Sequence, residues 1–108
     1  MNTIDLAMSE GAWLNEVVDY AQAHGWLVYH ARPARTKKGW RTPTQGDVGF
    51  PDLVLVRFDG KLVFAELKSH LGKVTPGQQQ WLSALRLRWP MVYVWRPSDR
   101  EEMQRVLE

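Results

Sequence analysis

Two short apolar runs, separated by only a few residues, constrain the fold of this chain more than any other part of its sequence. Residues 50–56 (FPDLVLV) and 62–68 (LVFAELK) have the length and the aliphatic content of buried β-strands. Between them lies Asp59-Gly60, a dipeptide typical of hairpin turns. The sequence therefore predicts that a β-hairpin forms the centre of the fold.

Charged side chains interrupt both predicted strands. Asp52 lies in the first run, and Glu66 and Lys68 lie in the second. Charged groups are costly among aliphatic neighbours unless they are paired or hold a metal. Residues i and i+2 of a strand project from the same face, so Glu66 and Lys68 emerge side by side. Two carboxylates and an ammonium at one sheet edge can hold a divalent cation and activate a water molecule beside it.

The length of the turn decides whether Asp52 joins this group. A two-residue loop would pair Asp52 with Leu67 and leave the two carboxylates on opposite faces of the sheet. A three-residue loop over 58–60 places Asp52 opposite Glu66, with β-carbons about 5 Å apart. Gly60 occupies the position at which that loop requires a positive φ. We therefore expect the three-residue loop, because the turn chemistry and the site then agree.

The same charged residues belong to a longer motif. Pro51-Asp52 followed by Glu66-Leu67-Lys68 resembles the signature of the PD-(D/E)XK nucleases. The wider pattern resembles the stand-alone VRR-NUC (virus-type replication-repair nuclease) domains common in phages, and it comprises residues 49–53, 64–68, 72–78 and 81–82. The resemblance extends from about Ser9 to the C-terminal helix. It implies an α/β fold of the restriction-endonuclease type, with a central mixed sheet flanked by helices.

The length of 108 residues suits a single domain over 1–108 with one core. No run approaches the roughly 18–20 apolar residues of a membrane span, and no signal-peptide pattern is present. The chain has no cysteine, which excludes disulfides and thiolate metal sites. We expect a cytoplasmic protein, within a bacterial host cell if the gene belongs to a phage.

Apolar periodicity predicts the elements before the hairpin. Ser9 can cap a helix that runs to about His24 and ends at Gly25. A strand over 26–30 follows, and residues 31–46 are predicted to form a long loop. One apolar stripe of the helix is expected to face the core, and it comprises Trp13, Leu14, Val17, Val18 and Ala21.

After the hairpin, Thr75-Pro76 is expected to open a second helix, since proline favours the first helical position. A fourth strand is predicted over 91–95, and Ser98 with Glu101 forms a capping-box pattern for a last short helix. The resulting order, αβββαβα, suits a mixed sheet flanked by helices. The side chains of the second helix expected to face inward are Trp81, Leu82 and Leu85.

The charged residues predict metal-dependent hydrolysis of phosphodiester bonds, which is also the activity that the resemblance implies. Asp52 and Glu66 are expected to bind Mg²⁺ or Mn²⁺, with the Leu67 carbonyl and water completing an oxygen shell. Carboxylates without a cysteine or histidine cluster argue against zinc. Lys68 is expected to orient or help deprotonate the attacking water and to offset charge on the phosphorus centre.

Glu10 is a further candidate because it falls near the centre of the apolar stripe of the first helix, in line with Leu14 and Val17. One possibility is that Glu10 is simply a first-turn carboxylate that interacts favourably with the helix dipole. Alternatively it belongs to the site, because a glutamate of the N-terminal helix in the resembled family supports the metal directly or through water. We expect the second role.

Gln78 has two interpretations of equal weight. Thr75-Pro76-Gly77-Gln78 is a capping box, in which the Gln78 side chain reaches back to the Thr75 amide. Its position also matches the glutamine of the resembled family, which would position Lys68 or the water at the metal. One side chain can fill both roles.

The segment 31–46 is predicted to be a DNA-binding arm. Residues 1–31 carry acids but no lysine or arginine, whereas residues 32–41 carry five cations and no acid. Such cations can neutralise phosphates, and a tryptophan can stack on an exposed base. The alternative is a merely solvated loop. The expected DNA-contacting residues are Arg32, Arg35, Lys37, Lys38, Trp40, Arg41 and, beyond the hairpin, Lys73.

Other functions remain open on the sequence alone. The chain could be a nucleic-acid-binding module without catalysis, or a structural subunit whose acids form only a buried network. Small members of the resembled family often cut branched DNA, such as four-way junctions, as symmetric homodimers. We expect branched DNA as the partner and a homodimer as the assembly, with a nicking or flap nuclease as the alternative.

Overall fold

The computed structural model describes residues 2–31, 34–36, 39–41 and 44–108 of the protein. Its elements, in chain order, are α1 (Thr3–Ala7), α2 (Glu10–Ala23), β1 (Trp26–His30), β2 (Ala34–Thr36), β3 (Gly39–Arg41), β4 (Leu53–Arg57), β5 (Leu62–Leu67), α3 (Pro76–Arg86), β6 (Val92–Trp95), the 3₁₀ turn η1 (Pro97–Asp99) and α4 (Arg100–Leu107). The predicted αβββαβα order is confirmed by α2, β1, β4, β5, α3, β6 and α4.

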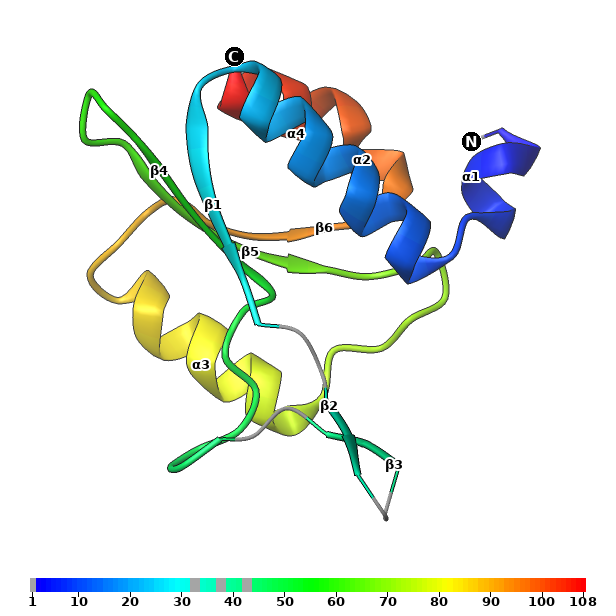
Figure 1. Cartoon of the computed structure of the whole chain (residues 1–108), viewed down its shortest axis with the longest axis vertical. Coiled ribbons are helices and arrows are strands. Elements are labelled where there is room, and N and C mark those ends of the chain that lie inside the picture. Colours follow the sequence, from blue (N-terminus) through cyan, green and yellow to red (C-terminus); the bar gives the residue numbers. More distant parts are fainter. Residues whose placement is uncertain (1, 32–33, 37–38, 42–43) are drawn as a thin grey trace.

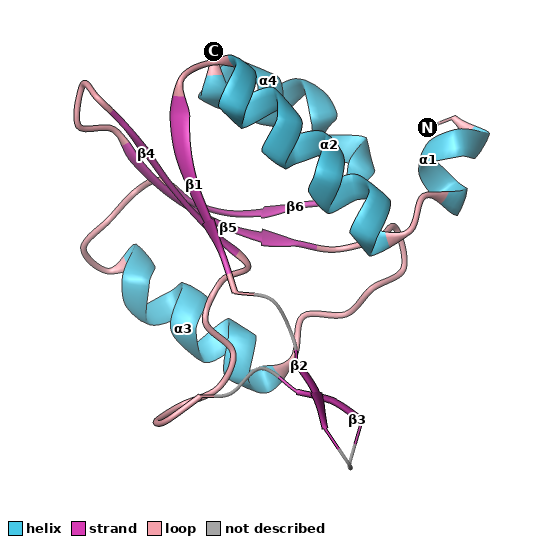
Figure 2. Ribbon diagram, in the orientation of Figure 1, coloured by secondary structure: helices cyan, strands magenta, loops and turns pink. Residues whose placement is uncertain are grey.

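A four-stranded mixed sheet forms the middle layer. Its strand order is β1-β4-β5-β6, with antiparallel pairs except for the parallel pair β5–β6. Helices α2 and α4 lie side by side over one face, and α3 lies on the other side of the sheet (Figure 1, Figure 2). The predicted mixed α/β fold is confirmed, and it is compatible with a restriction-endonuclease-like architecture.

The main core lies between the sheet and the helices α2 and α4. Alternation along β4 and β5 turns one set of side chains towards these helices. The predicted stripe of α2 is confirmed, with Leu14 and Val18 at its margin. On α3 only Leu82 is fully buried, while Trp81 and Leu85 are half-buried. The fully buried core residues of α2, β4, β5 and α4 are Trp13, Val17, Ala21, Leu53, Leu55, Val63, Ala65, Leu67, Met103 and Leu107.

The central hairpin has the predicted three-residue loop. The amide of Arg57 donates to the carbonyl of Lys61 at 3.0 Å, and the amide of Gly60 donates to the carbonyl of Arg57 at 2.8 Å. Gly60 has a φ of +88°, which a residue with a side chain adopts at a cost. The resulting register pairs Leu53 with Ala65. Both the turn and the register predicted from the sequence are therefore confirmed.

The helix starts are capped as predicted in two of three cases. Ser9 Oγ accepts the amide of Ala12 at 3.0 Å at the start of α2. The predicted capping box of Ser98 and Glu101 is wrong. A 3₁₀ turn begins at Pro97 instead, and Asp99 Oδ2 accepts the amide of Arg96 at 2.8 Å. The reach-back carboxylate therefore lies two residues earlier than predicted, because the proline starts a tighter turn before the helix.

Helix α1 and the strands β2 and β3 were not predicted. The short helix α1 is capped by Asn2, and its buried Asp5 contacts Arg100 of α4 at 2.9 Å. Residues 31–46, predicted as a loop, contain the antiparallel hairpin β2–β3. The sequence did not predict it because a three-residue strand is too short to produce a periodic pattern. Within the described part of the chain, no helix has both the length and the apolar character needed to cross a membrane.

Candidate active site

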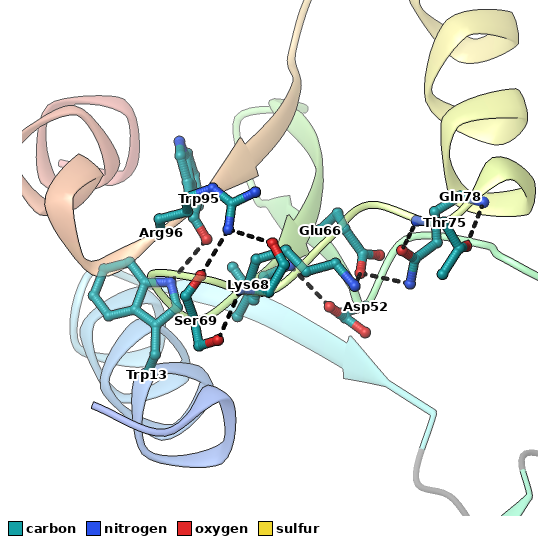
Figure 3. Close-up of polar contacts among 11 residues, drawn as sticks. Trp13, Asp52, Glu66, Lys68, Ser69, Thr75, Gln78, Trp95 and Arg96 are labelled. Carbon is teal, nitrogen blue, oxygen red and sulfur yellow. Dashed lines mark hydrogen bonds and ion pairs between the residues drawn. The ribbon is translucent and has the colours of Figure 1, made fainter. Parts of the chain in front are cut away.

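The charged residues of the hairpin meet where β4 begins and β5 ends, beside the N-terminus of α3 (Figure 3). The β4–β5 ladder extends to the pair Leu53 and Ala65, so the next residues along the two strands are Asp52 and Glu66. Lys68 immediately follows β5. The structure therefore brings together the two carboxylates and the ammonium that the sequence predicted as a site.

Glu66 is the most deeply buried charged residue of this group, with 1% of its surface exposed. Its Oε2 accepts a hydrogen bond from Gln78 Nε2 at 3.0 Å and lies 3.6 Å from Lys68 Nζ. Its Oε1 is also buried and receives no hydrogen bond from a donor among the described residues; a hydrogen bond between Glu66 and Asp52 requires a proton on one of the two carboxyl groups. A buried carboxylate oxygen without a partner is costly, because the desolvation of a charged group is left uncompensated.

The pKa of Glu66 is raised from its ordinary value near 4.5 to about 8. Burial is the largest cause, because it disfavours the ionised form. The negative charge of Asp52 and a hydrogen bond from protonated Glu66 to the Asp52 carboxylate act in the same direction. The ammonium of Lys68 opposes both effects but does not cancel them. Without an added positive charge, Glu66 therefore tends to hold a proton at neutral pH.

Asp52 is fixed by the backbone of the neighbouring strand. Its Oδ2 accepts the amide of Leu67 at 2.8 Å, and its side chain is half-buried. The other carboxylate oxygen, Oδ1, takes no part in this hydrogen bond. Leu67 thus takes part in the site through its backbone, although the predicted contribution of its carbonyl to a metal shell stays a prediction.

Gln78 forms the predicted capping box and also contacts the site, while its predicted role of positioning Lys68 or the water at the metal stays a prediction. Its Oε1 accepts the amide of Thr75 at 2.9 Å, while Thr75 Oγ1 accepts the amide of Gln78 at 3.2 Å. This is the capping box that opens α3. The other end of the same amide, Nε2, donates to Glu66. The helix cap thus fixes the orientation of a side chain that holds the buried carboxylate.

Glu10 is the first residue of α2 and lies at the margin of this group. The residue is exposed as a whole, yet partial burial of its carboxyl raises its pKa. The charge of Lys68 lowers that pKa and the charge of Asp52 raises it, so all three groups interact electrostatically. Among the described residues, no three His, Cys, Asp or Glu side chains form a metal-binding cluster. A role of Glu10 as a direct metal ligand therefore stays a prediction.

Trp13 supports the site in a way that no sequence pattern indicates. Its indole Nε1 donates to the carbonyl of Trp95 at 2.9 Å, and the amide of Lys68 donates to the same carbonyl at 3.1 Å (Figure 3). One oxygen therefore ties α2, which carries Glu10, to the backbone of Lys68. Apolar periodicity predicts that Trp13 is buried but cannot show which carbonyl its N–H meets.

The residues present fit a hard divalent cation. Glu66 Oε1 is buried without a described partner, and Asp52 supplies a second carboxylate whose charge raises the pKa of Glu66. A cation held by these carboxylates would give the buried Glu66 Oε1 a partner and would offset the repulsion between Asp52 and Glu66. Carboxylate and carbonyl oxygens are the donors that Mg²⁺ and Mn²⁺ prefer.

The predicted DNA-contacting residues lie on segments other than those that carry Asp52, Glu66 and Lys68. Lys73 is exposed in the segment that leads into α3. Arg35 belongs to β2, whereas Trp40 and Arg41 belong to β3. Three further predicted residues, Arg32, Lys37 and Lys38, lie outside the described residues.

A family model described as the VRR-NUC domain matches residues 13–99, which is most of the chain. The matched range includes the hairpin, α3 and β6 and thus all of the site except Glu10. No curated protein and no solved structure matches the chain.

Proposed function

Because this chain belongs to the VRR-NUC family, whose members are nucleases of the PD-(D/E)XK type, we propose that it is a metal-dependent endonuclease that hydrolyses phosphodiester bonds in DNA. The observation that carries this proposal is the state of Glu66. A carboxylate that is buried, lies beside a second acid and has an oxygen without a described partner is poorly explained by stability. It is well explained by a cation that the site is built to accept.

Asp52 and Glu66 would hold Mg²⁺ or Mn²⁺, with support from the Leu67 carbonyl and from Glu10. When bound, such an ion polarises the scissile phosphate and makes water a better nucleophile. The chain itself prepares this arrangement. The amide of Leu67 fixes Asp52, and Gln78 fixes one oxygen of Glu66 while the other receives no donor among the described residues.

Lys68 would act on the reacting groups directly. Its ammonium lies 3.6 Å from Glu66 Oε2 and is mostly shielded from bulk water. In this position it can orient the attacking water by hydrogen bonding and can stabilise the negative charge that develops on the phosphate oxygens. Electrostatic stabilisation of this kind is strongest where water is excluded.

The substrate we propose is branched DNA, such as a four-way junction, cut by a homodimer. One chain carries one pair of hairpin carboxylates, so paired incisions require two copies. The basic arm that includes β2 and β3 leads through residues 44–51 into the strand that follows Asp52. Cations on this arm would hold the phosphates of one DNA branch beside the active site.

Cleavage of supercoiled plasmid with Mg²⁺ and with EDTA tests the nuclease proposal. We expect nicking or linearisation with Mg²⁺ and none with EDTA. A protein that shifts DNA in a gel but never cleaves it would instead be a binding module, and one that does neither would be a structural subunit. Linear, flapped and four-way substrates, compared at equal concentration, then test the preference for branches.

A further inference from the structure

The residue that follows β6 holds the turn that follows β5. Arg96 Nη1 donates to the carbonyl oxygens of Ser69 at 2.7 Å and of Gly72 at 2.6 Å, and it lies 3.4 Å from that of His70 (Figure 3). One guanidinium nitrogen carries two hydrogens, so the two short contacts are full hydrogen bonds and the third is an electrostatic contact. We define residues 69–72 as the Lys68 turn.

Convergence of three carbonyl oxygens is unfavourable without a positive charge among them. Within the described part of the chain, the salt bridges do not include Arg96. Its charge is therefore directed at the backbone of the Lys68 turn and not at an acidic side chain. Besides the hydrogen bonds that the Gly72 amide donates to the carbonyl oxygen and Oγ of Ser69, the turn is therefore held by one side chain that lies more than twenty residues further along the chain.

The Lys68 turn folds back onto the side chain of Lys68. A β-carbon added to Gly72 would lie 3.5 Å from Lys68 Cδ and 3.1 Å from Ser69 Oγ. The amide of Gly72 also donates to Ser69 Oγ at 3.1 Å. The turn therefore packs along the aliphatic stem of Lys68, which is only 7% exposed. Closing the turn limits the positions that the lysine ammonium can take.

We propose that Arg96 is a positioning residue that holds the ammonium of Lys68 beside Glu66 by bracing the Lys68 turn. This proposal rests on the nuclease function proposed above, in which Lys68 acts on the water and the phosphate. Residues 95 and 96 then hold the lysine from two sides. The carbonyl of Trp95 accepts the Lys68 amide, and the side chain of Arg96 holds the turn that covers the Lys68 stem.

The main test compares Arg96→Met, which keeps the length of the side chain but removes its charge and donors, with Arg96→Lys, which restores a cation. For Arg96→Met we expect a single-turnover cleavage rate about tenfold lower or more, the range typical of residues that orient groups of a catalytic site. The Kd for DNA should change by less than about twofold, and Arg96→Lys should recover part of the rate. A rate for Arg96→Met equal to the wild-type rate, or a loss explained entirely by weaker binding, would overturn the proposal.

Arg57→Met serves as the matched control. Arg57 also donates to a main-chain carbonyl, that of Glu108 at 2.7 Å, but it lies at the end of β4 away from Asp52. We expect this variant to lower the Tm without lowering the cleavage rate. If Arg57→Met slows cleavage as much as Arg96→Met does, general destabilisation accounts for both, and the positioning role is refuted.

Gly72→Ala tests the same turn if Arg96→Met does not fold. Its added methyl group would crowd Ser69 Oγ at 3.1 Å and would touch Lys68 Cδ only in ordinary van der Waals contact at 3.5 Å. By disturbing the turn it should slow cleavage while leaving DNA binding intact. Unchanged cleavage by this variant would contradict the proposal.

Amide hydrogen exchange at Gly72 gives a readout that needs no nuclease activity. This amide donates to the carbonyl oxygen and Oγ of Ser69 within the turn, so opening of the turn in Arg96→Met should increase its exchange rate, and Arg57→Met should not. If the wild-type protein cleaves no DNA, the nuclease proposal fails by itself, and this exchange experiment still decides whether Arg96 braces the turn. Retained protection in Arg96→Met would overturn the brace.

Discussion

Gly49 and Gly77 lie in direct backbone contact, at the point where the segment before β4 passes the N-terminus of α3. A β-carbon on Gly49 would lie 2.5 Å from the carbonyl carbon of Gly77 and 2.7 Å from the amide nitrogen of Gln78. No real β-carbon tolerates these distances. The contact therefore sets the spacing between the segment that carries Asp52 and the helix that carries Gln78.

Gly49→Ala should lower both stability and cleavage. The methyl group would push the start of α3 away and separate Gln78 from Glu66, so we expect a cleavage rate at least about tenfold lower. Gly46→Ala is the matched control, because Gly46 has nearly the same φ, +103° against +106°, but has nothing within 4 Å of an added β-carbon. Both variants should lose about 1–2 kcal/mol from the backbone conformation, and only Gly49→Ala should lose activity beyond that. Equal activity of the two variants would contradict the spacing role.

Asp52→Ala, Glu66→Ala and Lys68→Ala should each lower the cleavage rate by about 100-fold or more, as expected when a group that stabilises transition-state charge is removed. DNA binding and the circular dichroism spectrum should change little, because the strands around Asp52 and Lys68 should stay folded when these side chains are replaced. Single-turnover cleavage with an excess of enzyme measures the effect. Activity of Asp52→Ala above about one tenth of the wild-type value would refute the metal-site assignment.

The stability of the metal-free protein should fall as the pH rises from about 4.5 to about 8. Glu66 has a folded pKa of about 8 and an ordinary value near 4.5, so in this range the folded state binds more protons than the unfolded state. The free energy of unfolding therefore decreases with pH in this window and levels off above it. Glu66→Gln lacks this titration and serves as the reference. Urea unfolding in EDTA at pH 5, 6.5 and 8 should show Glu66→Gln gaining stability relative to wild type; a constant difference would be inconsistent with the raised pKa.

Mn²⁺ and Mg²⁺ should support cleavage, whereas Ca²⁺ should bind without turnover because its larger and looser oxygen shell misplaces the reacting water. Each bound cation should also raise the Tm by mass action. Thermal unfolding with increasing Mn²⁺ measures binding separately from cleavage, and Glu66→Gln should show a smaller rise. Full activity in EDTA would exclude a metal-dependent reaction.

Replacing Lys37, Lys38 and Arg41 with alanine should weaken the salt dependence of DNA binding. Each lost phosphate contact lowers the slope of log affinity against log salt concentration by about 0.9, so we expect a decrease of about two to three. The single-turnover rate at saturating enzyme should change much less than the affinity. An unchanged slope would mean that the arm is only a solvated segment.

The sequence predicts the parts of this site that depend on local chemistry. Gly60 determines the turn and hence the register of Asp52 and Glu66, while Thr75-Pro76 and Gln78 determine the start of α3. Side-chain contacts with backbone atoms of distant segments cannot be predicted in this way, because those atoms come within reach only after the chain has folded. The carbonyls that Arg96 and Trp13 meet belong to this class.

The Gly49–Gly77 contact and the contact between buried Asp5 and half-buried Arg100 escape prediction for the same reason. The hairpin β2–β3 escapes for another, since its strands are three residues long and carry no alternation of apolar and polar residues. Sequence reasoning thus finds the groups that would perform the chemistry more readily than the groups that hold them in place.

The β4–β5 hairpin also has a consequence for the order of folding. Asp52, Glu66 and Lys68 all belong to this one local unit, whereas Glu10 and Gln78 arrive with helices from either side of it in the sequence. Local pairings form early because closing a short loop costs little entropy. We therefore expect the two acids to oppose each other early in folding, before Gln78 can compensate either of them. A divalent cation in the refolding buffer would thus accelerate folding as well as slow unfolding, and the ion would take part in building the enzyme before it takes part in the reaction.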